Sequence, residues 1–268
     1  MPQRGALTYE LAPGSKVILN VHGGGHVIGG LAQESRVMEE FALDLDLIVM
    51  NVDYRKLPEV SPIVQVLDVA SAYAYLLSNG VRPSDISMHG CSAGSNIIVS
   101  LLSHLRQSQS PLPQAVVLES LMMPGGGYKD FREYPDFRER GGQDVLSAEA
   151  MIQMQKWQGR WGAGHAGGVN SFFKLSALPA NSLVDLPPIL LLSSENEIGL
   201  PSVKENVAYL KRMSGGGRNR ISSRSFTCLY HCPVVGIGKT QPLLFGVPEA
   251  SLVYKATISW LQEHTRPE

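Results

Sequence analysis

The chain has 268 residues, of which 44% are hydrophobic and 18% are charged, so it can bury one sizeable core and lies near the upper size of a single domain. Its 23 basic and 24 acidic residues give a formal net charge of -1, which creates no field to attract nucleic acid or an anionic membrane. The sequence lacks both the roughly 18 to 20 apolar residues of a membrane span and the apolar core of a signal peptide. We therefore expect a cytoplasmic protein without a membrane span.

The first predicted strand, Val17 to Val21, runs directly into a glycine-rich loop with the sequence His22-Gly23-Gly24-Gly25-His26. A loop of this kind leaves backbone N–H groups uncovered, and such groups can stabilise the negative oxygen of a tetrahedral acyl intermediate. It could instead hold a phosphate, but it matches neither G-x-G-x-x-G nor a P-loop that ends in Gly-Lys-Ser/Thr. We therefore do not expect nucleotide binding.

The second predicted strand, Leu45 to Val52, is followed by the polar segment Asp53-Tyr54-Arg55-Lys56-Leu57-Pro58-Glu59. The next segment, Val64 to Leu77, carries apolar residues at helical spacing, which predicts a crossover helix. These apolar positions are Val66, Val69, Ala70, Tyr73 and Leu76.

The third predicted strand, Ile86 to His89, leads into Gly90-Cys91-Ser92-Ala93-Gly94 and a helical stretch from Ser95 to Leu105. The G-x-S-x-G pattern predicts a serine nucleophile at a tight strand-to-helix turn, with glycines where neighbouring backbones crowd together. The alternative is an ordinary helix start with Ser92 near the cap position. Cys91 is a second candidate nucleophile, although a residue before the turn normally points into the core.

A fourth strand is predicted from Ala115 to Leu118. The alternation of strand-like and helical segments then stops between about Met122 and Asp185. This stretch is rich in glycine, charge and aromatic residues, and we interpret it as a cap insertion over the C-terminal edge of the sheet, where ligands bind in open α/β folds. Its aromatic residues could line an apolar substrate pocket, or they could only pack the insertion onto the core. Candidate substrate contacts are His26, Tyr128 and Trp157.

The last two predicted strands, Ile189 to Ser193 and Arg224 to Leu229, each end at residues with catalytic potential. Glu195 and Glu197 lie in the turn after the first, and His231 follows the second. Where a G-x-S-x-G turn carries a nucleophilic serine, its acid and histidine partners follow it in that order along the chain. Of the late histidines His165, His231 and His264, His231 is the one that lies at the end of a strand.

Strands and helices therefore alternate along the chain, with further helices predicted from Val203 to Met213 and from Pro248 to Glu263. This alternation predicts an α/β fold with a mostly parallel central sheet and helices on both faces. We expect residues 1–268 to form a single domain with the cap insertion at about 122–185.

The three cysteines, Cys91, Cys228 and Cys232, are sparse and odd in number, so we expect reduced thiols. Cys228, His231 and Cys232 lie close together in the sequence, but a zinc site usually needs four suitably spaced ligands and no second Cys/His pair is near. We therefore expect neither a metal nor another cofactor.

The ordered motifs His-Gly-Gly-Gly, Asp-Tyr-Arg-Lys-Leu-Pro-Glu and Gly-x-Ser-Ala-Gly resemble those of the hormone-sensitive-lipase-like branch of the α/β-hydrolases. The resemblance covers about residues 15 to 265 and implies the α/β-hydrolase fold. It departs from the family pattern at Cys91, where an aspartate is usual, and at Ser95, where a glycine is frequent. The implied roles are nucleophile for Ser92, general base for His231, orienting acid for Glu197, and oxyanion-hole donors for Gly24, Gly25 and Ala93.

From this resemblance we expect a serine esterase that cleaves a small to medium apolar or aromatic ester through an acyl-enzyme. The partner is then a small-molecule ester, and the sequence leaves open whether the chain forms a homodimer. One alternative is a non-hydrolytic enzyme of the same fold, such as a lyase, cyclase, acyl transferase or lactone-forming or lactone-opening enzyme. Another is a ligand-binding receptor-like protein, although the receptors that resemble this family lack the histidine that His231 supplies here.

Overall fold

The structure is a computed structural model, and it describes residues 11, 14–123, 131–134, 136–144, 146–159, 175–214, 221–226 and 249–265. His231, Tyr128, His165, Cys228 and Cys232 lie outside the described residues. In the described ranges, no helix has both the length and the apolar character that a membrane crossing requires.

The centre of the fold is a sheet of six parallel strands in the order β2-β1-β3-β4-β5-β6. This confirms the predicted α/β fold. The central strands are buried along their whole length, as the continuous apolar runs in the sequence indicate. The strands are β1 (Val17–Val21), β2 (Ile48–Val52), β3 (Ile86–Cys91), β4 (Ala115–Glu119), β5 (Ile189–Ser194) and β6 (Ile221–Phe226).

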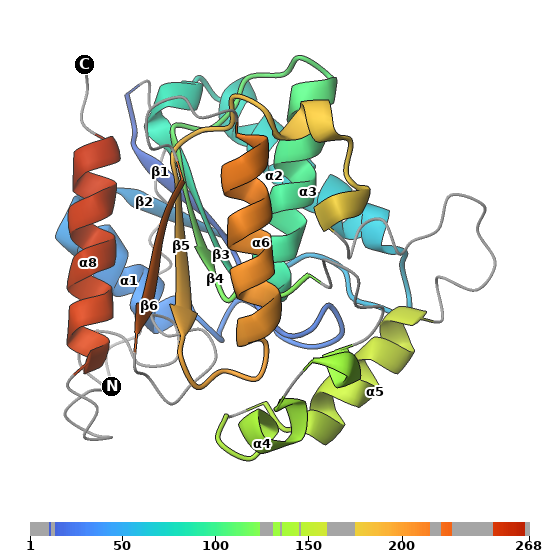
Figure 1. The fold of residues 1–268 in the computed structure, drawn as a ribbon. Coiled ribbons are helices and arrows are strands. Elements are labelled where there is room, and N and C mark those ends of the chain that lie inside the picture. The colour runs from blue at the N-terminus through green and yellow to red at the C-terminus, as the bar shows by residue number, and fades with distance from the viewer. Residues whose placement is uncertain are drawn as a thin grey trace, which may run out of the picture.

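Helices cover both faces of this sheet (Figure 1). One face packs on α1 (Ser35–Leu45) and α8 (Glu249–His264), through a core that includes Ile18, Phe41 and Tyr254. The opposite face carries the larger core and packs on α2 (Pro62–Ser78), α3 (Ala93–Gln107) and α6 (Leu200–Met213).

Helix α1 is an addition to the predicted elements, and it shortens β2. The sequence predicts a strand from Leu45, whereas the structure ends α1 at Leu45 and starts β2 at Ile48. Asp46 adopts the left-handed conformation with φ of 50°, which stops the helix and turns the chain into the strand.

The described part of the insertion forms α4 (Phe137–Gly141) and α5 (Ala148–Gly159), with a short 3₁₀ turn η2 at Phe131–Glu133. In Figure 1 these helices lie beyond the end of the sheet toward which the strand arrows point. Tyr134 and Phe137 are buried in a small cluster with Ile198 and Val203, so these two aromatic rings pack the cap onto the core.

Residues 175–183, at the end of the predicted insertion, do not lie with the cap helices. They pack beside α3 and α6, and Leu175 and Leu183 belong to the larger core. They form the 3₁₀ turns η4 (Leu175–Ala177) and η5 (Ala180–Leu183), and a further 3₁₀ turn, η1 (Pro83–Asp85), precedes β3. The cap helices α4 and α5 are therefore the described part of the insertion that stands at the sheet edge.

Candidate active site

Ser92 lies at the sharp turn between β3 and α3. Its backbone has φ of 52° and ψ of -114°, a conformation that a non-glycine residue adopts rarely and only where its surroundings impose it. The N–H of Ser92 donates to the carbonyl oxygen of Glu119 at 2.9 Å, so the end of β4 holds the turn from beneath. The residue is 8% exposed. Ser92 therefore lies at the strand-to-helix turn that the G-x-S-x-G pattern predicts, and its role as a nucleophile stays a prediction.

The flanking glycines let three backbone segments meet at this turn. A β-carbon on Gly94 would lie 1.9 Å from the carbonyl oxygen of Val21, at the end of β1. A β-carbon on Gly90 would lie 2.8 Å from the backbone of Gly94. Both contacts are shorter than real side chains show, so the close packing of β3, α3 and β1 depends on glycine at these positions.

The glycine loop, residues 22–26, lies beside the Ser92 turn. A β-carbon on Gly23 would fall 3.2 Å from the Cys91 sulfur and 3.5 Å from the Ser92 β-carbon, so the two segments are in contact. Gly24 has φ of 120°, and its carbonyl oxygen accepts the N–H groups of Val27 and Ile28 at 3.1 and 3.0 Å. The structure therefore brings the two predicted motifs together at one point.

The Asp53–Glu59 segment braces the glycine loop from its other side. The hydroxyl of Tyr54 donates to the carbonyl oxygen of His22 at 3.0 Å, and the two rings stack with centroids 4.3 Å apart. Burial lowers the pKa of His22, while its hydrogen bond with Gly23 acts in the opposite direction. Lys56 forms an ion pair with Asp53 at the outer end of this segment.

His26 ends the glycine loop and is 3% exposed. Gln65, on α2, donates its Nε2 to the His26 carbonyl oxygen at 3.0 Å, and its Oε1 lies 2.9 Å from His26 Nδ1. Since Oε1 can only accept, Nδ1 carries the proton. Burial lowers the pKa of His26 to about 4, so the ring is neutral near pH 7. His26 thus ties the loop to α2, and its contact with a substrate stays a prediction.

The two acidic residues after β5 differ sharply in burial. Glu197 is fully buried and its backbone N–H donates to the Ser194 carbonyl oxygen at 3.4 Å, whereas Glu195 is exposed. Arg140, on the cap helix α4, donates to the Glu195 carbonyl oxygen at 2.8 Å. A buried carboxylate at the end of a central strand suits the role of an orienting acid better than an exposed one.

The cap reaches the glycine loop through α5. A β-carbon on Gly25 would lie 2.3 Å from the Met154 sulfur, so this methionine packs directly over the loop. Trp157, one turn further along α5, is 38% exposed.

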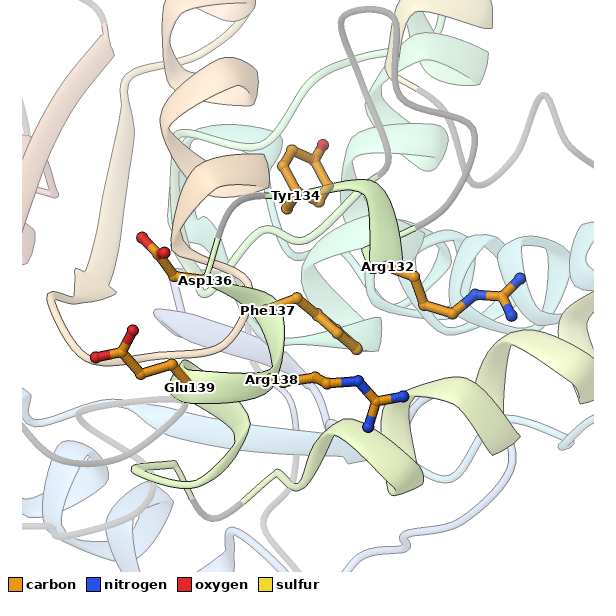
Figure 2. Close-up of a pocket in the computed structure, with 6 residues that line it drawn as sticks. All are labelled: Arg132, Tyr134, Asp136, Phe137, Arg138 and Glu139. Carbon is orange, nitrogen blue, oxygen red and sulfur yellow. The ribbon is translucent and has the colours of Figure 1, made fainter.

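A cavity of about 320 Å³ opens on the cap itself, and none of its lining residues belongs to the predicted site. In Figure 2, Arg132 and Arg138 point to one side while Asp136 and Glu139 point to the other. The lining is largely charged and consists of Arg132, Tyr134, Asp136, Phe137, Arg138 and Glu139. This cavity does not correspond to the apolar pocket that the sequence predicts.

Cys91, directly before Ser92, is 3% exposed and forms a disulfide. The expectation of reduced thiols is therefore wrong for this residue. Because a sulfur bound in a disulfide is not a thiolate, Cys91 in this state cannot act as a nucleophile. Among the described residues, no group of three or more His, Cys, Asp or Glu side chains is placed to hold a metal ion.

Sequence reasoning missed a row of buried polar side chains beneath the glycine loop. Asn20, Glu34, His89 and Glu119 are each at most 1% exposed. Three of them lie near the ends of apolar strands, and an isolated polar residue in such a run is the signal that could have identified them.

A sequence profile of the alpha/beta hydrolase fold matches residues 18–232, which include the glycine loop and the Ser92 turn. Among curated relatives, an esterase of Acinetobacter venetianus is 30% identical over 118 residues, which cover 44% of this chain and 39% of that protein. An acetyl-hydrolase of Streptomyces hygroscopicus is 25% identical over 184 residues, which cover 68% of this chain and 58% of that protein. The chain therefore spans less than two thirds of the length of both relatives.

Solved structures share the fold over nearly the whole chain. An esterase of the bacterial hormone-sensitive lipase family superposes with a TM-score of 0.72 and 23% identity, covering 95% of this chain and 80% of the other. Carboxyl esterase 2 of the mycorrhizal fungus Tuber melanosporum superposes with a TM-score of 0.75 and 18% identity, covering 96% of this chain and 80% of the other. At these identities the likeness establishes the fold.

Proposed function

This chain belongs to the alpha/beta hydrolase fold family, and from that premise we propose that it is a serine carboxylesterase with Ser92 as its nucleophile. The observation that carries the proposal is the contact between the Ser92 turn and the glycine loop, with Gly23 packed against Ser92. An acyl-transfer site needs an activated oxygen beside preorganised N–H donors. The contact supports the proposal because it places a serine beside a glycine loop whose N–H groups could act as those donors.

In the proposed reaction, His231 removes the hydroxyl proton of Ser92 as the serine oxygen attacks the ester carbon. The electron pair of the C=O bond moves to the carbonyl oxygen, and the N–H groups of Gly24, Gly25 and Ala93 stabilise that negative charge. When the intermediate collapses, the C–O bond to the alcohol breaks and His231 returns its proton to the leaving oxygen. Water then attacks the acyl-enzyme in the same way, while the Glu197 carboxylate orients the imidazole.

Apolar residues that follow the glycine loop in the sequence or lie on the cap helix α5 support the proposal of a small to medium apolar acyl group. Ile28 and Leu31, which follow the loop, are 61% and 48% exposed, and Trp157 on α5 is 38% exposed. Met154 covers the loop from the cap side. Apolar side chains placed around a few convergent polar groups are typical of small-molecule sites. We propose Trp157 and Tyr128 as substrate contacts.

The test is hydrolysis of p-nitrophenyl esters of increasing acyl length by the wild type and by Ser92→Ala and His231→Ala. We expect kcat to fall on the order of 10⁴-fold or more in both variants. Ser108→Ala, which alters an exposed serine in the turn after α3, is the matched control and should retain full activity. Hydrolysis that survives in Ser92→Ala would overturn the mechanism.

Labelling with a fluorophosphonate separates the hydrolase from non-hydrolytic enzymes of the same fold. A hydrolase should be labelled at Ser92 and should also turn over esters. Wild-type protein that is labelled at Ser92 but hydrolyses none of the esters would support the non-hydrolytic alternative.

The cytoplasmic location expected from the sequence stays a prediction. The disulfide of Cys91 counts against it, because disulfides persist mainly in oxidising compartments. Cell fractionation with thiol trapping before lysis would measure both the location and the oxidation state.

A further inference from the structure

A cluster of four buried polar side chains lies beneath the glycine loop, on the sheet face that α1 and α8 cover. Asn20 is on β1, His89 on β3 and Glu119 at the end of β4, while Glu34 is the residue directly before α1. Each is at most 1% exposed. We refer to Asn20, Glu34, His89 and Glu119 as the buried tetrad.

The sheet register places part of the tetrad in one row. Asn51 of β2, Asn20 of β1 and His89 of β3 are direct partners across adjacent parallel strands, so their side chains stand on the same face. Hydrogen bonds join the row. Asn20 Nδ2 donates to Asn51 Oδ1 at 2.8 Å, and Asn20 Oδ1 lies 2.7 Å from His89 Nδ1.

The hydrogen-bond directions within the tetrad follow from the chemistry of its members. Ionised Glu34 can only accept, and its Oε2 receives Asn20 Nδ2 at 3.0 Å. The Asn20 oxygen therefore faces His89 and accepts a hydrogen bond from the Nδ1–H of His89. The other ring nitrogen, Nε2, lies 2.7 Å from Glu119 Oε1, so one proton is shared between that nitrogen and that oxygen.

The two ends of the tetrad reach the two halves of the proposed active site. Glu34 Oε1 accepts the backbone N–H of Gly23, directly before the proposed oxyanion-hole donors, at 2.9 Å. At the other end, the Glu119 carbonyl oxygen accepts the Ser92 N–H at 2.9 Å and the Ser95 hydroxyl at 2.8 Å. A continuous chain of buried contacts thus connects the glycine loop with the nucleophile turn.

We propose that the buried tetrad is a positioning device, in which the Glu34 carboxylate, held through Asn20, His89 and Glu119, fixes the glycine loop against the Ser92 turn. This inference rests on the proposed function. Two donors, Gly23 N–H and Asn20 Nδ2, converge on Glu34, so both of its oxygens must accept. A carboxylate meets that requirement, whereas an amide of the same size presents a donor to one of the two.

A buried carboxylate is costly unless it is hydrogen-bonded, and both oxygens of Glu34 accept a hydrogen bond here. Burial raises the pKa of Glu34, while the charge of His89 and the hydrogen bonds from Gly23 and Asn20 act in the opposite direction. The same contacts that stabilise the Glu34 anion are the ones that hold the loop.

The experiment compares Glu34→Gln with the double variant Asn20→Asp/Glu34→Gln. The double variant exchanges the amide and the carboxylate between these two hydrogen-bonded residues. In the double variant, the new amide can donate to the new carboxylate, which still accepts from His89 Nδ1. Asn51 can turn its own amide to donate to that carboxylate as well. The exposed Glu39→Gln, on the same helix α1, is the matched control.

We expect Glu34→Gln to lower kcat for p-nitrophenyl butyrate on the order of 10²-fold with KM within about threefold, because a displaced oxyanion donor affects the transition state most. The double variant should recover at least about tenfold of that loss, and Glu39→Gln should match the wild type. A merely structural role predicts instead that kcat per folded molecule is unchanged. Unchanged kcat in folded Glu34→Gln overturns the proposal.

Two further outcomes keep the test decisive. If Glu34→Gln does not fold, kcat of the double variant is compared with that of the wild type instead. A folded double variant whose kcat is reduced 10²-fold or more overturns the proposal. Failure of the proposed function is separate, because it appears in the wild type as absent hydrolysis. Failure of this inference leaves the wild type active and Glu34→Gln equally active.

Discussion

Met154 of the cap helix α5 lies directly over Gly25 of the glycine loop, so closely that a β-carbon on Gly25 would fall 2.3 Å from the methionine sulfur. The thioether therefore occupies the space beside the proposed oxyanion hole. Methionine is flexible and adapts to irregular gaps, so it limits the room for an acyl chain without closing it.

Met154→Ala should shift the substrate preference toward longer acyl chains. Removing the side chain opens space beside Gly25, and differences of a few methylenes in an apolar pocket change kcat/KM by about tenfold or more. We expect the ratio of kcat/KM for p-nitrophenyl octanoate over acetate to rise on the order of tenfold. Gln153→Ala, at the exposed neighbouring position, should leave the ratio unchanged. An unaltered ratio in Met154→Ala would show that the acyl chain lies elsewhere.

Gly94→Ala should destabilise the protein and abolish esterase activity. The added methyl group would meet the Val21 carbonyl oxygen at 1.9 Å, and this backbone atom cannot move without shifting β1 or α3. We expect the free energy of unfolding in urea to fall by about 1–3 kcal/mol or more, as for overpacked cores. Gly30→Ala, whose β-carbon would approach no closer than 3.9 Å to Asp53, serves as the control. Equal stability of the two variants would refute the close packing at Gly94.

Glu197→Gln should lower kcat on the order of 10⁴-fold, because an amide does not favour the imidazole tautomer that the reaction needs. Glu195→Gln should have little effect, since Glu195 is exposed. Steady-state kinetics of both variants with p-nitrophenyl butyrate make the comparison. A large loss in Glu195→Gln together with an active Glu197→Gln would reverse the assignment of the acid.

The burial of His26 should make the protein less stable as the pH falls from about 6.5 to about 4. Burial lowers the pKa of His26 to about 4, against an ordinary value of 6.5. Between these values the unfolded chain binds a proton that the folded chain does not, so acid favours unfolding. From pH 7.5 to pH 5 the expected loss is about 2 kcal/mol.

Urea titrations of the wild type and of His26→Asn at the two pH values measure this contribution. Asparagine tolerates the positive φ of 71° at this position and does not titrate. The variant should show a smaller loss of stability between pH 7.5 and pH 5. An identical loss in both proteins would assign the acid sensitivity to other groups, such as His22, whose pKa burial also lowers.

Much of the fold could be predicted because its signals are local. The apolar runs that form β1, β3 and β5 stand out in the sequence, and the Ser92 turn follows from its glycines. Helix α1 was missed because its end and the start of β2 form one continuous run, and the left-handed Asp46 that separates them has no distinctive sequence signal.

The buried tetrad could not be predicted for a different reason. Asn20, His89 and Glu119 each stand alone in an apolar run, where a polar residue has several explanations. Only the register of the parallel strands brings them into contact, and register is a property of pairing between distant segments. The preference for Glu197 over Glu195, by contrast, is supported by the burial of Glu197.

The order of the strands has a consequence for how fast this protein folds. The glycine loop follows β1, Ser92 follows β3 and Glu197 follows β5, and in the sheet these strands are joined only through pairings between segments far apart in the chain. Non-local pairings of this kind form slowly, because loop closure must precede them. Esterase activity should therefore return late during refolding, after helical structure has formed, and its recovery would report completion of the sheet.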